Sequence, residues 1–162
     1  MIRVFKSDVI GQQLGKRELE QLAADFKRYK ETGIPAACFG RDVPYDHPHT
    51  LPSVRSENLM HLHLAEGAQH WANRQTQYNR TSDHHLVYCR GFYEADHFLL
   101  MAILKPDAHA QAHNNSIMGK LAIMAAKFRA QFSWATVNRN NGFLQEFRLA
   151  FFIPCISETK RF

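Results

Sequence analysis

The spacing of apolar residues predicts two long helices. In residues 16–32, apolar side chains from Leu19 to Phe26 recur three and four positions apart, which places them on one helix face. Gly33 follows directly and predicts where this helix ends. A second stripe with the same spacing predicts a helix over residues 114–132, and Asn114 is a residue type that favours a helix N-cap.

Shorter apolar runs predict strands. In residues 59–64, Met60, Leu62 and Leu64 alternate with His61 and His63, so the two histidines share one face of the predicted strand. The other predicted strands are residues 3–5, 84–90 and 98–105. The last of these is apolar on both faces and is expected inside the sheet, and residues 91–96 are short enough for a hairpin before it. Five prolines and glycines interrupt residues 35–57, for which we predict a long loop.

This order of elements predicts an α+β fold, in which N-terminal and C-terminal helices pack on an antiparallel meander sheet. We assign residues 1–132 to one domain. Residues 133–162 form a C-terminal extension that is too apolar for a disordered tail, with five phenylalanines among its residues. We expect it to pack on the domain or on a second copy of the chain, as in a homodimer.

Composition limits the function further. The 162 residues carry a formal net charge of +5, which suits a polyanionic partner such as RNA or an acidic protein. The three cysteines are odd in number and show no CxxC spacing, so reduced thiols in the cytoplasm are expected. No apolar run reaches the roughly 18–20 residues of a membrane span, and the first residues lack the apolar core of a secretory signal.

The densest set of candidate catalytic residues flanks the predicted hairpin of residues 84–105. The start of one antiparallel strand lies beside the end of its neighbour, so Arg80, His85, Lys105 and His109 are expected at one end of the sheet. These residue types suit cleavage of RNA without a metal ion or cofactor, because RNA brings its own nucleophile, the 2′-hydroxyl. The protein then supplies a base, an acid and cations for the phosphate.

In this interpretation Arg80 binds the scissile phosphate, His85 and His109 share the acid and base roles, and Lys105 adds positive charge. Further basic and imidazole side chains are assigned to RNA contacts: Arg41, His61, His63, Arg90 and His113. Solvated surface groups at a sheet end would give the same pattern, so spacing alone leaves both interpretations open.

The run from Asn79 to Tyr88 resembles a strand signature of RelE-like toxins, in which a basic residue precedes Leu-Val-Tyr. Over residues 1 to about 132 the chain more closely resembles the YafO family of toxins. The matching pieces include Arg3-Val4-Phe5, Ala24-Asp25-Phe26, Phe39-Gly40-Arg41-Asp42, His61-Leu62-His63-Leu64, Arg80-Thr81, His85-Leu86-Val87-Tyr88-Cys89, Ala102-Ile103-Leu104-Lys105-Pro106, His109, Asn114-Asn115 and Phe128-Arg129.

The resemblance implies a RelE-like fold and a ribosome-dependent mRNA interferase of a type II toxin–antitoxin system. It also implies two partners, mRNA on the ribosome and a cognate antitoxin. The chain departs from the RelE-like pattern at His85, where arginine is usual, and at His109 and His113, which replace a basic segment containing tyrosine. Residues 133–162 extend beyond the family pattern.

Two alternatives remain at this point. His61 and His63, with Glu66 nearby, resemble the ligand pattern of a cupin-like metal enzyme, although the spacing to Glu66 is short. A non-catalytic toxin of the RelE/ParE fold, which binds its target without cutting RNA, would not need the cluster around His85 and His109.

Overall fold

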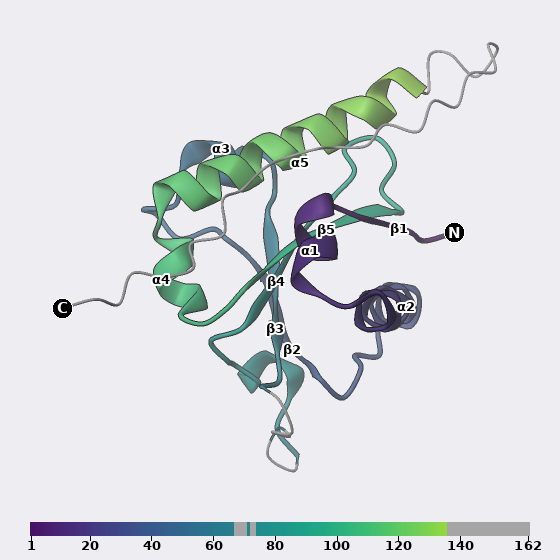
Figure 1. The fold of residues 1–162 in the computed structure, drawn as a ribbon, viewed down its shortest axis with the longest axis vertical. Coiled ribbons are helices and arrows are strands. Elements are labelled where there is room, and N and C mark those ends of the chain that lie inside the picture. The colour runs from purple at the N-terminus through teal and green to yellow at the C-terminus, as the bar shows by residue number, and fades with distance from the viewer. Residues whose placement is uncertain (67–70, 72–73, 136–162) are drawn as a thin grey trace.

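The computed structural model describes residues 1–66, 71 and 74–135 and contains one five-stranded sheet with helices on both faces (Figure 1). In chain order, the elements are β1 (Arg3–Lys6), α1 (Asp8–Gln13), α2 (Lys16–Thr32), β2 (Phe39–Pro44), α3 (Pro52–Ser56), β3 (Met60–Leu64), the 3-10 turn η1 (Gln77–Asn79), β4 (His85–Arg90), β5 (His97–Leu104), α4 (Ala108–Ala112) and α5 (Asn115–Ala135). The predicted α+β class is therefore confirmed. In the described part of the chain, no helix has the length and apolar character needed to cross a membrane.

The strand order is β1-β5-β4-β3-β2, and the sheet is mixed. Strands β2 to β5 each run antiparallel to the next, but β1 pairs with β5 in parallel, with Arg3 opposite His97. The prediction of a wholly antiparallel sheet was thus wrong. A short strand such as β1 gives no sequence signal of its direction, which depends on how α1 and α2 carry the chain across the sheet.

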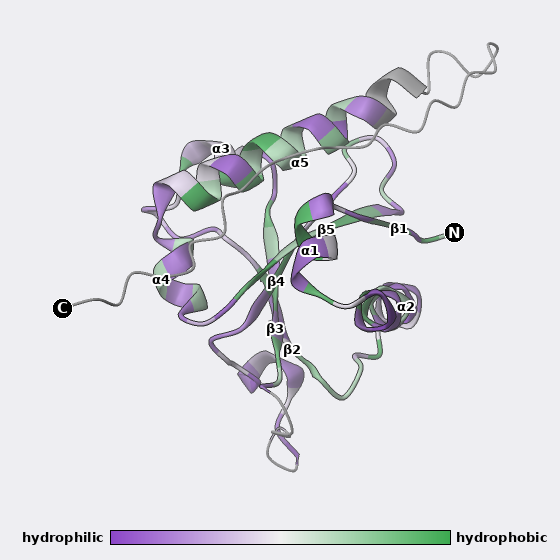
Figure 2. Cartoon of the chain, in the orientation of Figure 1, coloured by the Kyte–Doolittle hydropathy of each residue, from purple (hydrophilic) through white to green (hydrophobic). Residues whose placement is uncertain are grey.

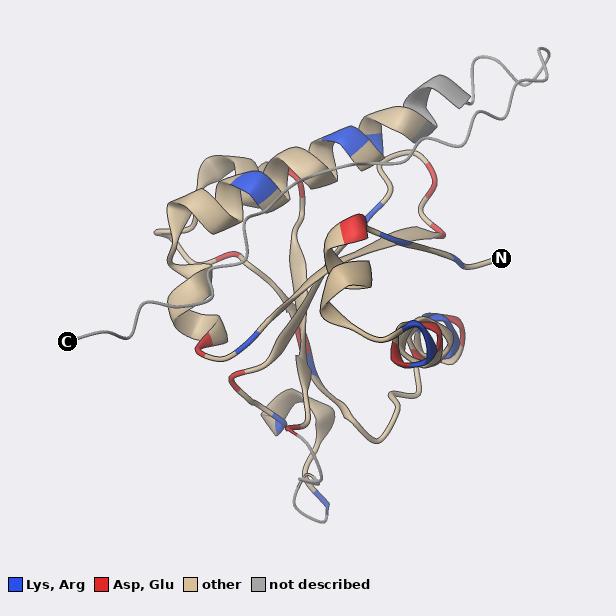
Figure 3. Cartoon of the chain, in the orientation of Figure 1, with Lys and Arg blue, Asp and Glu red and all other residues tan. Residues whose placement is uncertain are grey.

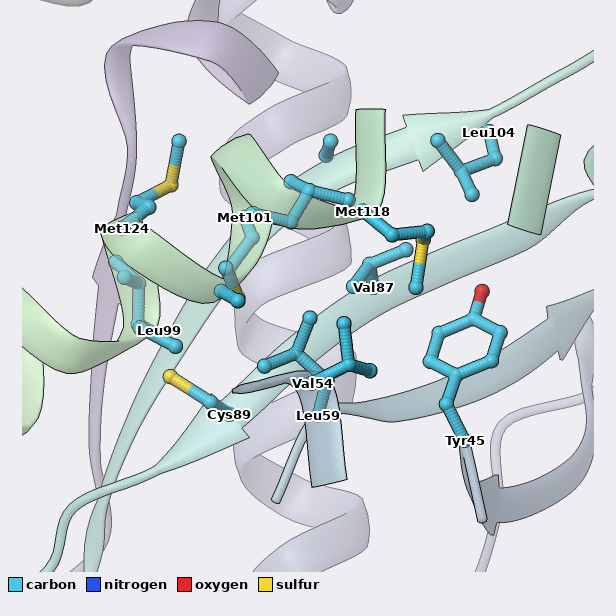
Figure 4. Close-up of a cluster of buried hydrophobic side chains, with 14 of the residues drawn as sticks. Tyr45, Val54, Leu59, Val87, Cys89, Leu99, Met101, Leu104, Met118 and Met124 are labelled. Carbon is cyan, nitrogen blue, oxygen red and sulfur yellow. The ribbon is translucent and has the colours of Figure 1, made fainter. Parts of the chain in front are cut away.

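Apolar side chains fill two cores, one on each face of the sheet. On the first face, Phe26 of α2 is fully buried against strand residues such as Leu86 and Leu100. On the other face, α5 packs Met118 and Met124 onto the strands (Figure 4). Figure 2 shows the matching pattern, with apolar residues along the strands and polar residues on the outer surface of α2.

The predicted loop over residues 35–57 was wrong, because it contains β2 and α3. Its prolines stand where regular elements tolerate them. Pro44 is the last residue of β2, which is an edge strand, and Pro52 opens α3. The short helices α1 and α4 were also not predicted. By contrast, the end of α2 at Gly33, which has a left-handed φ of 73°, is as predicted.

A partly buried polar network joins α2 to the sheet. The carboxylate of Asp42 accepts hydrogen bonds from Tyr29, from Lys30 at 2.6 Å and from Tyr88 at 2.6 Å. Burial, with the nearby charge of Asp42, raises the pKa of Tyr88 well above its usual range. The tyrosine of the Leu-Val-Tyr run therefore packs on the α2 face, opposite the cavity described below.

Most of residues 133–162 lie outside the described residues. The predictions that this extension packs on the domain or forms a homodimer therefore also concern residues outside the described ones. Helix α5 continues to Ala135, three residues beyond the predicted domain boundary at 132.

Candidate active site in a histidine-lined cavity

A cavity of about 520 Å³ opens between β2, β3, β4 and the segment that runs from α4 into α5. Among the described residues, seven histidines line it: His47, His49, His61, His63, His85, His109 and His113. Residues 45–51, which follow β2, form another part of its wall. The cavity thus lies on the α5 face of the sheet, at the end where β4 begins.

Three of these histidines form the floor. His61 and His63 share one face of β3, as strand alternation predicted, and His85 on β4 stands opposite His63 in the register. The ring centroid of His85 lies 4.6 Å from that of His61 and 4.4 Å from that of His63. We call His61, His63 and His85 the histidine triad.

Two residues of the triad are buried and His61 is partly buried, which was not predicted. His63 is 3% exposed and His85 is 1% exposed. Burial, with smaller contributions from neighbouring imidazoles, lowers the pKa of both His61 and His85 to about 3, and burial also lowers that of His63. The triad is therefore uncharged at neutral pH.

Tyr45 holds the triad from one side. Its ring stacks on His61 at 4.2 Å, and its hydroxyl lies 3.2 Å from His85 Nδ1. On the other side, His63 Nδ1 lies 2.7 Å from the carbonyl oxygen and 2.9 Å from the amide nitrogen of Ser82. These contacts fix the planes of the rings.

His109 differs from the triad because it is exposed and paired with a carboxylate. Its Nδ1 lies 2.7 Å from Asp83 Oδ1, and the same oxygen accepts the backbone N–H of His109 at 3.1 Å. These hydrogen bonds lower the pKa of Asp83. When Nδ1–H donates to Asp83, Nε2 keeps its lone pair and can accept a proton. The ring of His109 lies 4.8 Å from that of His85.

His113 stands one helical turn beyond His109, at the C-cap of α4. Residues at positions i and i+4 are neighbours on a helix surface, and both imidazoles line the cavity. Two exposed histidines therefore stand side by side along one wall.

Among the described residues, Arg41 is the single arginine or lysine that lines the cavity. Its guanidinium lies 4.3 Å from the ring of Tyr78, and its Nε donates to the Tyr78 carbonyl. Arg41 lies on β2 beside Gly40. A β-carbon on Gly40 would collide with the Arg80 carbonyl, so a residue without a side chain is needed there.

The structure brings together part of the predicted catalytic set. His85 and His109 are adjacent, as the ends of the hairpin suggested. Arg80 does not line the cavity, since its Nε donates to the Gln75 carbonyl, and Lys105 is exposed beyond the lining residues.

Of the residues assigned to RNA contacts, four line the same cavity: Arg41, His61, His63 and His113. Arg90 is at the other end of β4, where its Nε donates to the Ala95 carbonyl. Sequence reasoning missed Asp83 as a partner of His109. The available signal was that both residues flank the strands of one hairpin.

The cupin-like ligand set is not assembled as the sequence suggested. Glu66 does not line the cavity, and its Oε1 lies 3.6 Å from His84 Nε2. His85 occupies the place beside His61 and His63 instead.

Comparisons with known proteins give the class of the chain. Residues 27–130 match a family model described as toxin YafO, type II toxin–antitoxin system. The chain is 42% identical to a protein from Escherichia coli strain K12 named mRNA interferase toxin YafO. The alignment spans 132 residues, which are 81% of this chain and the whole length of the relative. The chain therefore belongs to the YafO family of type II toxins, as its resemblance indicated. No solved structure matches it.

Proposed function

We propose that this protein is the toxin of a type II toxin–antitoxin pair and acts as an endoribonuclease that cuts mRNA on the ribosome. The observation that carries the proposal is the Asp83–His109 pair, an oriented and solvent-accessible imidazole at a cavity large enough for a nucleotide. Membership of the YafO family and the name of the E. coli relative, mRNA interferase toxin YafO, support it.

The cleavage step uses groups that the cavity presents. Nε2 of His109 accepts the proton of the RNA 2′-hydroxyl while the 2′-oxygen attacks the phosphorus. The bond from phosphorus to the 5′-oxygen then breaks, and His113 in its protonated form donates a proton to that oxygen. The products are a 2′,3′-cyclic phosphate and a 5′-hydroxyl end.

Arg41 lines the cavity, and we assign it the role of stabilising the extra negative charge on the phosphate in the transition state. It takes the role that the sequence suggested for Arg80 and Lys105, whose side chains do not line the cavity. We assign the acid role to His113 in place of His85, because an imidazole with a pKa of about 3 is neutral at neutral pH, and the N–H of a neutral imidazole is too weak an acid to protonate the leaving oxygen.

Dependence on the ribosome fits the small number of cationic side chains that line the cavity. A single arginine is expected to bind RNA weakly, since affinity for RNA rises with the number of phosphates that are neutralised. The ribosome would hold the mRNA and present it to the cavity. We accordingly propose that the protein acts in the cytoplasm.

The proposal extends to the fold and the partners. We place the chain among the RelE-like toxins, supported by helices on both faces of the sheet and by the run from Asn79 to Tyr88. An antitoxin of acidic character suits the net charge of +5 and α5, which carries basic but no acidic residues in its described length (Figure 3). A homodimer through residues 133–162 remains part of the proposal.

The test compares cleavage of a defined mRNA by purified toxin with and without ribosomes. We expect cleavage with ribosomes, resistance of the activity to chelator concentrations that keep ribosomes intact, and cyclic phosphate ends. Equal cleavage of naked RNA would refute the ribosome dependence.

Variants test the assigned roles. His109→Ala and His113→Ala should each lower the rate about 10²–10⁴-fold and relieve growth arrest, whereas His47→Ala should remain toxic. Full toxicity of His109→Ala with intact antitoxin binding would favour the non-catalytic toxin instead.

A further inference from the structure

The histidine triad has the composition of a metal site. Each of its three residues offers a ring nitrogen, and these three nitrogens lie within 4.8 Å of one another. We propose that the triad binds one divalent transition metal ion of the Zn²⁺ class, and that the bound ion inhibits the toxin.

Unpaired ring nitrogens support this site. Among the described residues, His61 Nδ1 and His85 Nε2 are buried without a hydrogen-bond partner. A buried polar atom with no partner is costly and rare in folded proteins. A metal ion would use such a lone pair in place of a hydrogen bond.

The surroundings of the rings also suit coordination. A metal-binding histidine usually donates its other ring N–H to a carbonyl or another oxygen acceptor, which fixes the ring. His63 Nδ1 has the Ser82 carbonyl oxygen at 2.7 Å, and His85 Nδ1 has the Tyr45 hydroxyl at 3.2 Å. The Ser82 amide nitrogen also lies 2.9 Å from His63 Nδ1, so the shorter contact to the carbonyl oxygen is the one that Nδ1–H would use on metal binding. When Nδ1 of each of these two rings carries the proton, Nε2 keeps the lone pair that a metal needs.

Ligand chemistry selects the ion. Imidazole nitrogens suit Zn²⁺, Cu²⁺, Ni²⁺ or Co²⁺, whereas Mg²⁺ and Ca²⁺ require oxygen ligands. Three histidines with an open fourth position form a well-known Zn²⁺ arrangement. Zn–N bonds are about 2.0–2.1 Å long, so small rotations of the three rings would close the site.

The inhibitory effect comes from His109 and rests on the proposed function. Its ring lies 4.8 Å from that of His85 and 6.0 Å from that of His63. Among the described residues outside the triad, His109 is therefore the imidazole whose ring contacts two triad rings and that could complete a tetrahedral site. A lone pair bound to the metal cannot accept the proton of the RNA 2′-hydroxyl.

The binding test uses the full-length chain without a histidine tag, stripped of metal by a chelator and then dialysed. Titration with Co²⁺ should produce the visible absorption of a tetrahedral Co²⁺ complex at one ion per chain, and Zn²⁺ should displace it. Zn²⁺ should also raise the melting temperature. Absence of stoichiometric binding would overturn the proposal.

Conservative variants of the triad test whether its histidines are the ligands of the bound ion. His61→Phe keeps a ring for Tyr45 to stack on, and His63→Gln keeps a polar group beside Ser82. Each should weaken Zn²⁺ binding beyond the roughly 10–100-fold typical for loss of an outer partner. His49→Ala, a histidine of the same cavity outside the triad, should bind as wild type. Circular dichroism confirms that each variant is folded. Unchanged binding by both folded triad variants would overturn the site.

Cleavage assays with ribosomes separate this inference from the proposed function. We expect cleavage in chelator and its loss as Zn²⁺ saturates the site. Full cleavage at saturating Zn²⁺ would overturn the inhibitory role, and cleavage that requires Zn²⁺ would overturn both that role and the metal-free chemistry. If the metal-free toxin is inactive on ribosomes, the proposed function fails, while the Co²⁺ titration still decides whether the triad binds metal.

Discussion

Mild acid should destabilise this protein because of its buried histidines. The pKa values of His61 and His85 are about 3 in the folded chain, against an ordinary value of 6.5. Below pH 6.5 the unfolded chain takes up protons at these two residues and the folded chain does not. The free energy of unfolding therefore falls as the pH drops from about 6.5 toward 3.

The size of the effect follows from this difference in proton binding. Between pH 7 and pH 5, each of the two histidines should remove up to about 2 kcal/mol of stability. Both together approach ~4 kcal/mol, and residual solvent around His61 lowers the expected loss to about 2–3 kcal/mol. That is a large share of the 5–15 kcal/mol typical of a folded domain.

The assay is urea unfolding at pH 7, 6 and 5, with chelator present so that metal binding does not contribute. His61→Phe removes one of the two titrating groups and keeps the stack on Tyr45. Its stability should fall about 1–2 kcal/mol less than that of wild type between pH 7 and pH 5. The exposed His49→Gln variant is the control and should follow wild type. Parallel loss of stability in wild type and His61→Phe would refute the reasoning.

Three further predictions concern single residues. Asp83→Asn keeps an oxygen acceptor but removes the charge beside His109, the proposed catalytic base, so ribosome-dependent cleavage should fall about 10- to 100-fold and shift in its pH profile, at nearly unchanged melting temperature. Asp42→Ala leaves Lys30, whose side chain is 16% exposed, without its carboxylate, and urea unfolding should show a loss of about 3–5 kcal/mol. Gly40→Ala should cost roughly 1–3 kcal/mol, because its β-carbon meets a backbone carbonyl, whereas Gly11→Ala, which has free space in α1, should be neutral or stabilising in the same assay.

Sequence periodicity predicted the elements that have a strong pattern. The helices α2 and α5 and the strands β3, β4 and β5 were all expected close to their observed positions. Strand β2 was missed because it is an edge strand that ends in proline. The short helices were missed because six or fewer residues carry too little of a 3.6-residue period to be recognised.

The site was predictable where it depends on neighbouring strands. Alternation along β3 put His61 and His63 on one face, and the hairpin put His85 near His109. The burial of the triad was not predictable, because it depends on α4, α5 and residues 45–51, which are folded over the strands by tertiary contacts. Nothing local to Arg80 or Lys105 reveals that their side chains do not line the cavity.

The chain order of the site bears on when during translation the protein becomes harmful. Asp83 is synthesised 26 residues before its partner His109. Strand β1 can join the sheet only after β5 has been synthesised, because Arg3 of β1 pairs with His97 of β5. Pairing between such distant segments is slow compared with local contacts. A chain still being synthesised, or released early by a stop before residue 109, has the carboxylate but not the imidazole that it orients. Toxicity would then require that synthesis has passed His109, which leaves the antitoxin an interval to capture each new copy.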